Sequence, residues 1–112
     1  MTRTRPSGST SEVSSRSARA LATLGRDEDA RVVFGKLLAT PAWHPRLLAA
    51  AWLAGRGDPR GLEVLTALAA DTDPEVRIQA IGLAPARADL LLTSLVDADG
   101  RVRVAAAARL VR

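Results

Sequence analysis

Carboxylate side chains in closely spaced pairs are the groups of this sequence that could bind a metal ion. Asp71 and Asp73 form one pair, and Asp97 and Asp99 form a second. Grouped carboxylate oxygens are preferred ligands of hard cations such as Ca²⁺. Each pair, however, directly precedes a predicted helix, where an aspartate oxygen can accept a hydrogen bond from a free backbone amide. Because capping accounts for both pairs, and for the acidic residues 27–29, we predict no metal site.

The single histidine, His44, is the side chain that could act as a general base. It stands between Trp43 and Pro45, and no obvious nucleophile lies nearby in the sequence, whereas a general base needs a positioned partner. Cysteine is absent, which excludes disulfides, thiolate metal sites and cysteine nucleophiles. Two glycines in residues 55–58 could suggest a phosphate cradle, but no predicted strand precedes them and no P-loop lysine follows. We therefore predict a non-catalytic chain without a cofactor.

The composition indicates a helical core. The chain has 112 residues, enough for one small domain, with 47% hydrophobic but 3% aromatic residues. A core built from Leu, Val and Ala favours closely packed helices over a β-sandwich, which needs β-branched and aromatic side chains. Trp52 lies in an apolar run and is predicted to be in the core. Trp43 lies in a predicted turn, where it is either an interface anchor or a lid on the core.

Short helices separated by regular breaks are expected to position these residues. Helix ends and starts are indicated at residues 25–27, 41–45, 55–59, 71–74, 84–85 and 97–100. The stretches between the breaks have the helical spacing of apolar residues, as in Val76, Ala80 and Leu83. We predict seven short helices and no strand in a domain of residues 12–112. Residues 1–11 are predicted to be a disordered, basic, Ser/Thr-rich tail.

An internal repeat is the most specific signal in the sequence. Residues 71–80 align without a gap with residues 97–106, at an offset of 26, and five of the ten positions are identical. A looser copy, residues 45–51, aligns with residues 74–80 at an offset of 29, and a weaker one begins near Val13. One helix pair cannot bury its apolar stripe alone, so neighbouring pairs stack around a continuous core. The repeat therefore predicts a solenoid.

The motif Asp-x-Asp-Pro-x-Val-Arg-x-x-Ala, followed by a helix of small residues, resembles the HEAT-like repeats that are also found in phycobilisome lyases. The clean match covers residues 56–110, and a degenerate match extends to about Glu12. The resemblance implies an all-α fold, a short α-solenoid of about three and a half antiparallel helix pairs in a right-handed superhelix.

The same resemblance implies structural roles for the repeated charged residues. In such repeats, aspartate and arginine side chains form a hydrogen-bonded ladder between stacked units. The matching ladder positions here are Asp71, Arg77, Asp97 and Arg103, and the matching helix caps are Asp73 and Asp99. In the upstream unit Thr40 or Ala42 stands at the aspartate position and Arg46 is displaced, so the sequence departs there from the ladder pattern.

Charge is distributed unevenly along the chain. The net charge is +4, and residues 1–26 and 100–112 each carry +4, whereas residues 27–99 carry seven bases and eleven acids. A nucleic-acid-binding body is expected to have a basic stripe on its folded face. The acidic middle of the chain therefore favours a protein partner. Fifteen of the 16 basic residues are arginine, which we interpret as the GC-rich codon usage of an actinobacterial-type genome.

We predict that the chain is a protein-interaction or scaffold module. Its working surface is expected to be the concave one, which the second helix of each pair forms in such repeats. The candidate surface residues are Trp43, Arg60, Glu63, Arg87 and Asp89. Two alternatives stay open: a nucleic-acid-binding protein of the DNA-repair type, and a lyase or chaperone subunit resembling phycobilisome lyases.

The two ends of the sequence lead to further expectations. The first residues contain no apolar targeting segment, and no apolar run approaches the roughly 20 residues of a membrane-spanning helix, so we predict a cytoplasmic protein. Residues 101–111 are predicted to form a helix that spreads apolar side chains over more than one face. We expect this helix to be covered by a second copy of the chain, by a partner or by a downstream segment.

Overall fold

The computed structural model describes residues 9–85 and 89–111, which form seven α-helices and no strand. The helices are α1 (Ser9–Thr23), α2 (Asp27–Leu37), α3 (Trp43–Gly55), α4 (Pro59–Leu68), α5 (Pro74–Leu83), α6 (Asp89–Ser94) and α7 (Gly100–Val111). The all-α prediction is confirmed. Helix α1 begins at Ser9, so residues 9–11, which were predicted to belong to the tail, are helical. Serine and threonine are favoured where a helix begins, because their hydroxyls can accept from free backbone amides.

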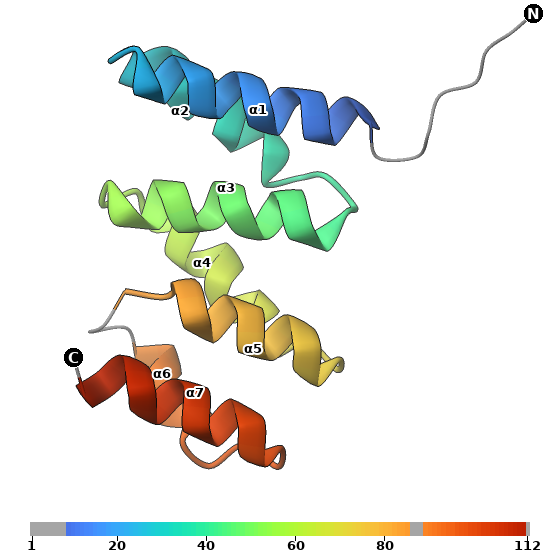
Figure 1. Cartoon of the computed structure of the whole chain (residues 1–112), viewed down its shortest axis with the longest axis vertical. Coiled ribbons are helices and arrows are strands. Elements are labelled where there is room, and N and C mark those ends of the chain that lie inside the picture. The colour runs from blue at the N-terminus through green and yellow to red at the C-terminus, as the bar shows by residue number, and fades with distance from the viewer. Residues whose placement is uncertain (1–8, 86–88, 112) are drawn as a thin grey trace, which may run out of the picture.

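The helices stack in two layers along the longest dimension of the molecule, which measures 50 × 34 × 18 Å. In Figure 1, α1, α3, α5 and α7 lie in front, and α2, α4 and α6 lie behind them. Each second helix packs against its own first helix and against the first helix of the next pair. This arrangement is the stack of helix pairs that defines an α-solenoid. We call the outer surface of the α2, α4 and α6 layer the second-helix face.

Two glycines make the turns inside the first and second helix pairs. Gly25 and Gly57 both have φ of +81°, a left-handed conformation that a Cβ atom would strain. The residue after each glycine donates a backbone hydrogen bond to a carbonyl in the last turn of the first helix. The amide of Arg26 donates to the carbonyl of Leu21 at 2.8 Å, and the amide of Asp58 donates to the carbonyl of Leu53 at 2.9 Å. These glycine-terminated helix ends let the second helix begin directly after the first.

Aspartate caps start three of the helices. The side chains of Asp58, Asp73 and Asp99 accept hydrogen bonds from the backbone amides two residues later, at 2.8 to 3.0 Å. Pro59 and Pro74 occupy the first helical position after two of the caps, where the missing amide costs nothing. The predicted helix starts at these positions are therefore explained by local chemistry.

The buried residues recur from pair to pair. Val76 and Ala80 lie in the same buried cluster as Val102 and Ala106, at the predicted offset of 26. Upstream, the buried set is Pro45, Ala49, Ala50 and Leu53, and the set 31 residues later is Val76, Ala80, Ile81 and Ala84. The predicted upstream offset of 29 is therefore wrong. That alignment paired Pro45 with Pro74, but Pro74 begins α5 whereas Pro45 is the third residue of α3.

A second buried cluster joins the first pair to α3. Phe34 of α2 and Leu53 of α3 are its largest fully buried members, and both are essentially inaccessible to solvent. Buried aliphatic side chains, together with Phe34, therefore form the core of the stack from α1 to α7. None of the described helices combines the length and the apolar character that a membrane span requires.

Candidate interaction surface

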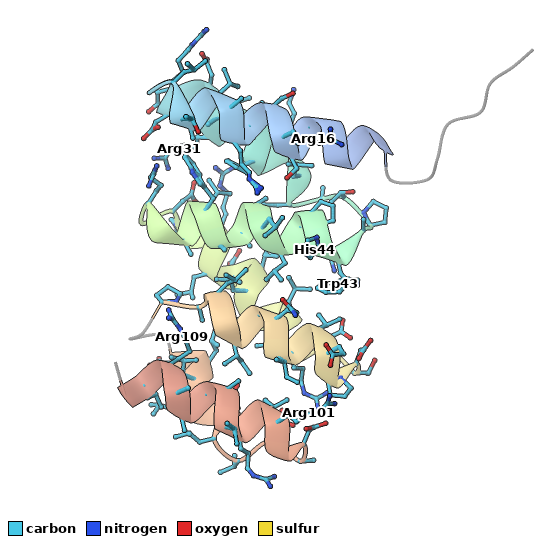
Figure 2. The ribbon with its side chains drawn as sticks, in the orientation of Figure 1. Arg16, Arg31, Trp43, His44, Arg101 and Arg109 are labelled. Carbon is cyan, nitrogen blue, oxygen red and sulfur yellow. The ribbon has the colours of Figure 1, made fainter. Side chains whose placement is uncertain are left out.

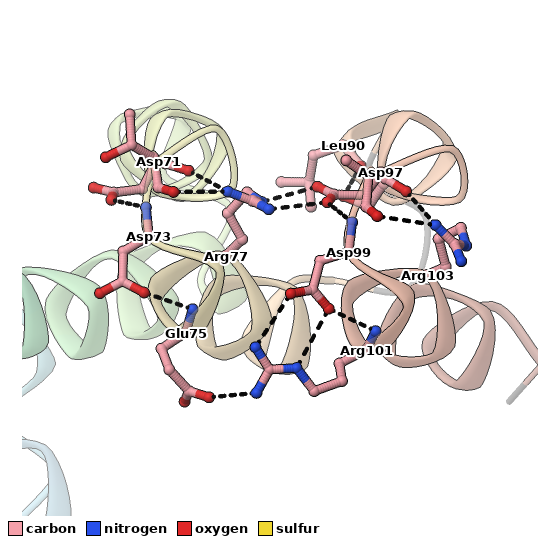
Figure 3. Close-up of polar contacts among 12 residues, drawn as sticks. Asp71, Asp73, Glu75, Arg77, Leu90, Asp97, Asp99, Arg101 and Arg103 are labelled. Atoms are coloured by element: carbon pink, nitrogen blue, oxygen red, sulfur yellow. Dashed lines mark hydrogen bonds and ion pairs between the residues drawn. The ribbon is translucent and has the colours of Figure 1, made fainter.

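Arg77 connects the turn before α5 to the turn before α7. One of its terminal nitrogens donates to the carbonyl oxygens of Asp71 and Thr72, at 2.8 and 3.2 Å. Its Nε and its other terminal nitrogen donate to the two carboxylate oxygens of Asp97, at 2.9 and 3.0 Å (Figure 3). Both side chains are about 15% exposed or less. A bidentate, largely buried pair of this kind is the stronger class of ion pair.

The carboxylate of Asp97 has a second partner inside its own turn. It accepts a hydrogen bond from the backbone amide of Asp99 at 2.8 Å. This amide, together with the guanidinium of Arg77, holds the pKa of the Asp97 carboxyl below its ordinary value. Asp71 makes the same turn bond to the amide of Asp73, at 2.8 Å. The two turns therefore have the same internal geometry (Figure 3).

Arg101 and Arg103 complete the polar contacts around α7. Arg101 reaches the carboxylates of Asp99 and Glu75, both at 3.1 Å, and its hydrogen bonds lower the pKa of Asp99. Arg103 donates to the carbonyl of Asp97 at 2.7 Å, as Arg77 does to Asp71. Within residues 9–85 and 89–111, Arg103 has no carboxylate partner corresponding to the Asp97 partner of Arg77.

Arg46 occupies the equivalent place in the second pair. Its guanidinium donates to the carbonyl of Thr40 at 3.1 Å, six residues earlier, which is the spacing from Arg77 to Asp71 and from Arg103 to Asp97. The expectation that Arg46 is displaced is therefore wrong, because it followed from the offset of 29.

The ladder is nevertheless open between Arg46 and Asp71. No hydrogen bond or ion pair joins these two described residues. They instead line a cleft of about 390 Å³ with Glu63, Val64, Ala67 and Leu68. Asp97 follows Arg77 by 20 residues, whereas Asp71 follows Arg46 by 25. The longer second helix, with ten residues in α4 against six in α6, contributes to this difference.

Asp58 lies at the junction of the first and second pairs. Its carboxylate is nearly buried and accepts from the Arg60 side chain at 3.1 and 2.7 Å and from Arg31 at 3.3 Å. Hydrogen bonds from Arg60, foremost that of its side chain, hold the pKa of Asp58 far below its ordinary value. Figure 2 shows Arg31 at the boundary between the two pairs. Asp58 is thus a cap that also binds the neighbouring pair.

An aromatic stack adjoins this junction. The rings of Phe34 and Trp52 are 4.7 Å apart and nearly parallel, and the guanidinium of Arg56 lies 4.4 Å from the Trp52 ring. Arg56 also pairs with Asp27 of α2 at 3.4 Å. Trp52 is partly buried and packs against the second buried cluster, so it contributes to the contact between pairs.

A cationic cleft opens on the second-helix face between α2 and α4. It measures about 400 Å³ and is lined by Arg31, Val32, Gly35, Lys36 and Arg60. Three of these five residues carry a positive charge. A Cβ atom on Gly35 would lie 3.1 Å from a terminal nitrogen of Arg60, so the missing side chain makes room for the guanidinium. This cleft concentrates positive charge in the acidic middle of the chain.

Exposed aliphatic side chains accompany the cleft. Val32 of α2, Leu62 of α4 and Leu92 of α6 are 58, 38 and 59% exposed. Leu95 and Val96, in the turn after α6, are exposed as well. Each helix of the second layer therefore presents an apolar side chain to solvent, as interaction surfaces do.

The predicted surface residues are not brought into one cluster. Arg60 lines the cationic cleft, whereas Glu63, on the same helix, lines the cleft of Arg46 and Asp71. Trp43 begins α3 in the other layer, packs partly buried against the core and meets the edge of the His44 ring (Figure 2). Asp89 is exposed at the start of α6. Arg87 lies outside the described residues.

Several contributors to the surface were missed by sequence reasoning. Arg31, Gly35 and Lys36 become important only because α2 lies beside α4, and no local motif marks them. The guanidinium of Arg109 donates to the carbonyl of Ala84, at the end of α5 (Figure 2). The missed contacts all join different helix pairs.

Helix α7 buries one side and exposes another. Val102 and Ala106 are buried, whereas Val104 and Leu110 are 70 and 38% exposed. Self-association through residues 101–111 stays a prediction. In the part of the chain that the structure describes, no group of three or more His, Cys, Asp and Glu side chains could hold a metal ion.

Comparison with known proteins adds one match. A family model described as HEAT repeats matches residues 7–84. No curated protein and no solved structure matches the chain.

Proposed function

Since the matched residues make up more than half of its length, the chain belongs to the HEAT-repeat family, and we propose that it is a protein-interaction module working through the second-helix face. HEAT repeats generally serve as scaffolds for protein–protein interactions. The stack of helix pairs offers an extended surface for a partner. The proposal therefore assigns binding, and no reaction, to this chain.

The observation that carries the proposal is the apolar exposure of the second layer. Val32, Leu62 and Leu92 place one exposed aliphatic side chain on each of the three helices. Charged side chains surround them, as in the polar rim of an interface. In the first layer, α5 exposes Leu83 and α7 exposes Val104 and Leu110, whereas α3 exposes no large aliphatic side chain. The second layer thus has an exposed aliphatic side chain on every helix, so a partner lying along it would remove apolar area from water over the length of the stack.

Site-specific photo-crosslinking tests this assignment in cells of the native source. A photoreactive amino acid at Leu62 is expected to form an adduct with a defined partner protein. Leu83, on α5, is the matched control because its exposed fraction of 42% is close to the 38% of Leu62. If Leu62 and Leu83 gave the same adducts, the proposal would be contradicted. It would also be contradicted if photoreactive residues at Leu62 and at Leu92 both gave no adduct.

A further inference from the structure

We propose that the cationic cleft between α2 and α4 binds an acidic peptide segment of the partner, in which Glu or Asp residues stand two to four positions from aliphatic ones. This inference rests on the proposed function and names the chemistry of the partner. The cleft is defined by Arg31, Val32, Gly35, Lys36 and Arg60.

The charges of the cleft do not cancel within the chain. Asp58 is the acid bonded to the cleft, and its two oxygens already accept from Arg31, from the side chain of Arg60 and from the amide of Arg60. Against three cations this leaves two positive charges unbalanced. Lys36 is exposed, and its ammonium group forms no hydrogen bond or ion pair with any described residue. An incoming carboxylate would therefore meet an ammonium group that has no internal partner.

The walls of the cleft favour a peptide with apolar neighbours. Gly35 leaves an open floor across which the Arg60 guanidinium lies. Val32, beside it, is more than half exposed. A carboxylate held by Lys36 and Arg60 would bring an aliphatic residue two to four positions away onto Val32, because side chains at that separation in a peptide can share one contact face.

The surroundings disfavour a long polyanion. Exposed acids lie on the same layer, with Glu28 on α2, Glu63 on α4 and Asp89 on α6. A nucleic-acid duplex carries one charge per roughly 1.7 Å of its axis, so a duplex lying along this layer would meet these carboxylates. A short acidic segment satisfies the cleft without that repulsion.

Zero-length crosslinking offers a direct test, because Lys36 is the single lysine of the chain. The probe is an acetylated and amidated peptide of Glu-Glu-Leu repeats, which contains carboxylates but no amine. Carbodiimide activation of the full chain with this peptide is expected to yield an adduct that peptide mapping places on Lys36. In a parallel titration, the backbone amide resonances of Gly35, Lys36 and Arg60 are expected to shift.

Three variants separate the site from general charge attraction. Lys36→Glu is expected to weaken peptide binding about tenfold, since the local charge changes by two units. Arg19→Glu changes the net charge by the same amount on an exposed position of α1 and is expected to leave binding unchanged. Lys36→Arg keeps the charge, so it should retain affinity but lose the crosslink. Circular dichroism verifies that each variant is folded.

The outcomes are distinguishable from a failure of the proposed function. Absence of peptide binding, or equal weakening by Lys36→Glu and Arg19→Glu, overturns the acidic partner. Tighter binding of random duplex DNA than of the peptide, at about 150 mM salt, also overturns it. Photo-crosslinking at Leu62 reports a partner of any charge. Adducts there without peptide binding would therefore leave the interaction module standing and remove only the acidic segment.

Discussion

The second and third helix pairs are held in the stack by different means. In the second pair, α4 crosses α3 at Gly61, where a Cβ atom would lie 2.4 Å from both the carbonyl oxygen of Ala50 and the amide nitrogen of Ala54. In the third pair the second helix, α6, has six residues, and the turn after it is held by the ion pair of Arg77 and Asp97. The second pair is thus held by close contact between the backbones of α3 and α4, and the third pair by an ion pair between side chains.

The difference teaches that the arginine motif alone does not make a rung of the ladder. Arg46 and Arg77 bind the turn carbonyl in the same way, six residues back. Arg77 also reaches a carboxylate of the next turn, and Arg46 does not. The segment between the arginine and the next aspartate is five residues longer in the second pair, and there the two side chains are not bonded. In that pair, α3 and α4 are instead in close backbone contact at Gly61.

The largest expected effect is on the glycine contact. Gly61→Ala should lower the free energy of unfolding by about 3 kcal/mol, because the new Cβ atom meets backbone atoms that cannot rotate away. Urea denaturation followed by circular dichroism measures the loss. Gly82→Ala is the matched control: a Cβ atom on Gly82 would have no other atom within 4 Å, so helix propensity should raise stability by up to about 1 kcal/mol. If Gly61→Ala left the stability unchanged, the backbone contact at Gly61 would not be what holds the second pair.

The ladder itself is the next largest effect. Arg77→Ala should cost about 2 kcal/mol, since it leaves the largely buried Asp97 carboxylate without its bidentate partner. Arg46→Ala should cost less than about 1 kcal/mol, because Arg46 bonds a single carbonyl. The same urea experiment compares them. We call the contact of Arg77 with Asp97 the closed junction, and the unbonded pair of Arg46 and Asp71 the open junction. Equal losses of stability in the two variants would show that the two junctions do not differ energetically.

The helices and their caps were predictable because they depend on residues that are close in the sequence. The contacts between helix pairs were not predictable, because they depend on how the pairs stack. Asp73 followed by Pro74 predicts a helix start from the local sequence alone. The offset of 26 between Val76 and Val102 is likewise visible in the sequence. The contact of Arg31 with Asp58 spans 27 residues and exists only because two pairs are adjacent. The cationic cleft depends on the same adjacency, so Arg60 was predicted as a surface residue without its neighbours on α2.

One missed relation was present in the sequence. Arg46 lies six residues after Thr40, as Arg77 does after Asp71, but an alignment centred on Pro45 hid that spacing. Proline is tolerated throughout the first turn of a helix. It is therefore a poor register marker, and the arginine would have been a better one.

Acid should weaken the closed junction. The pKa of Asp97 is lowered in the folded protein, by the Asp99 amide and by Arg77. Its charge therefore contributes stability above its ordinary pKa, and the contribution is lost as the pH falls through the folded value. Asp97→Asn should be less stable than the natural chain at neutral pH, and the difference should shrink as the pH falls below the ordinary range of an aspartate pKa. A difference that is constant with pH would mean that the ion pair adds nothing beyond hydrogen bonding.

The smallest effect separates burial from charge at the closed junction. Arg101 joins the same two pairs as Arg77, through Glu75, but both side chains of that pair are about 60% exposed. Water and salt screen an exposed pair, and holding two long side chains in place costs conformational entropy. Arg101→Ala should therefore leave the urea midpoint almost unchanged. A loss approaching that of Arg77→Ala would show that charge between the turns, and not its removal from water, closes the third pair onto α7.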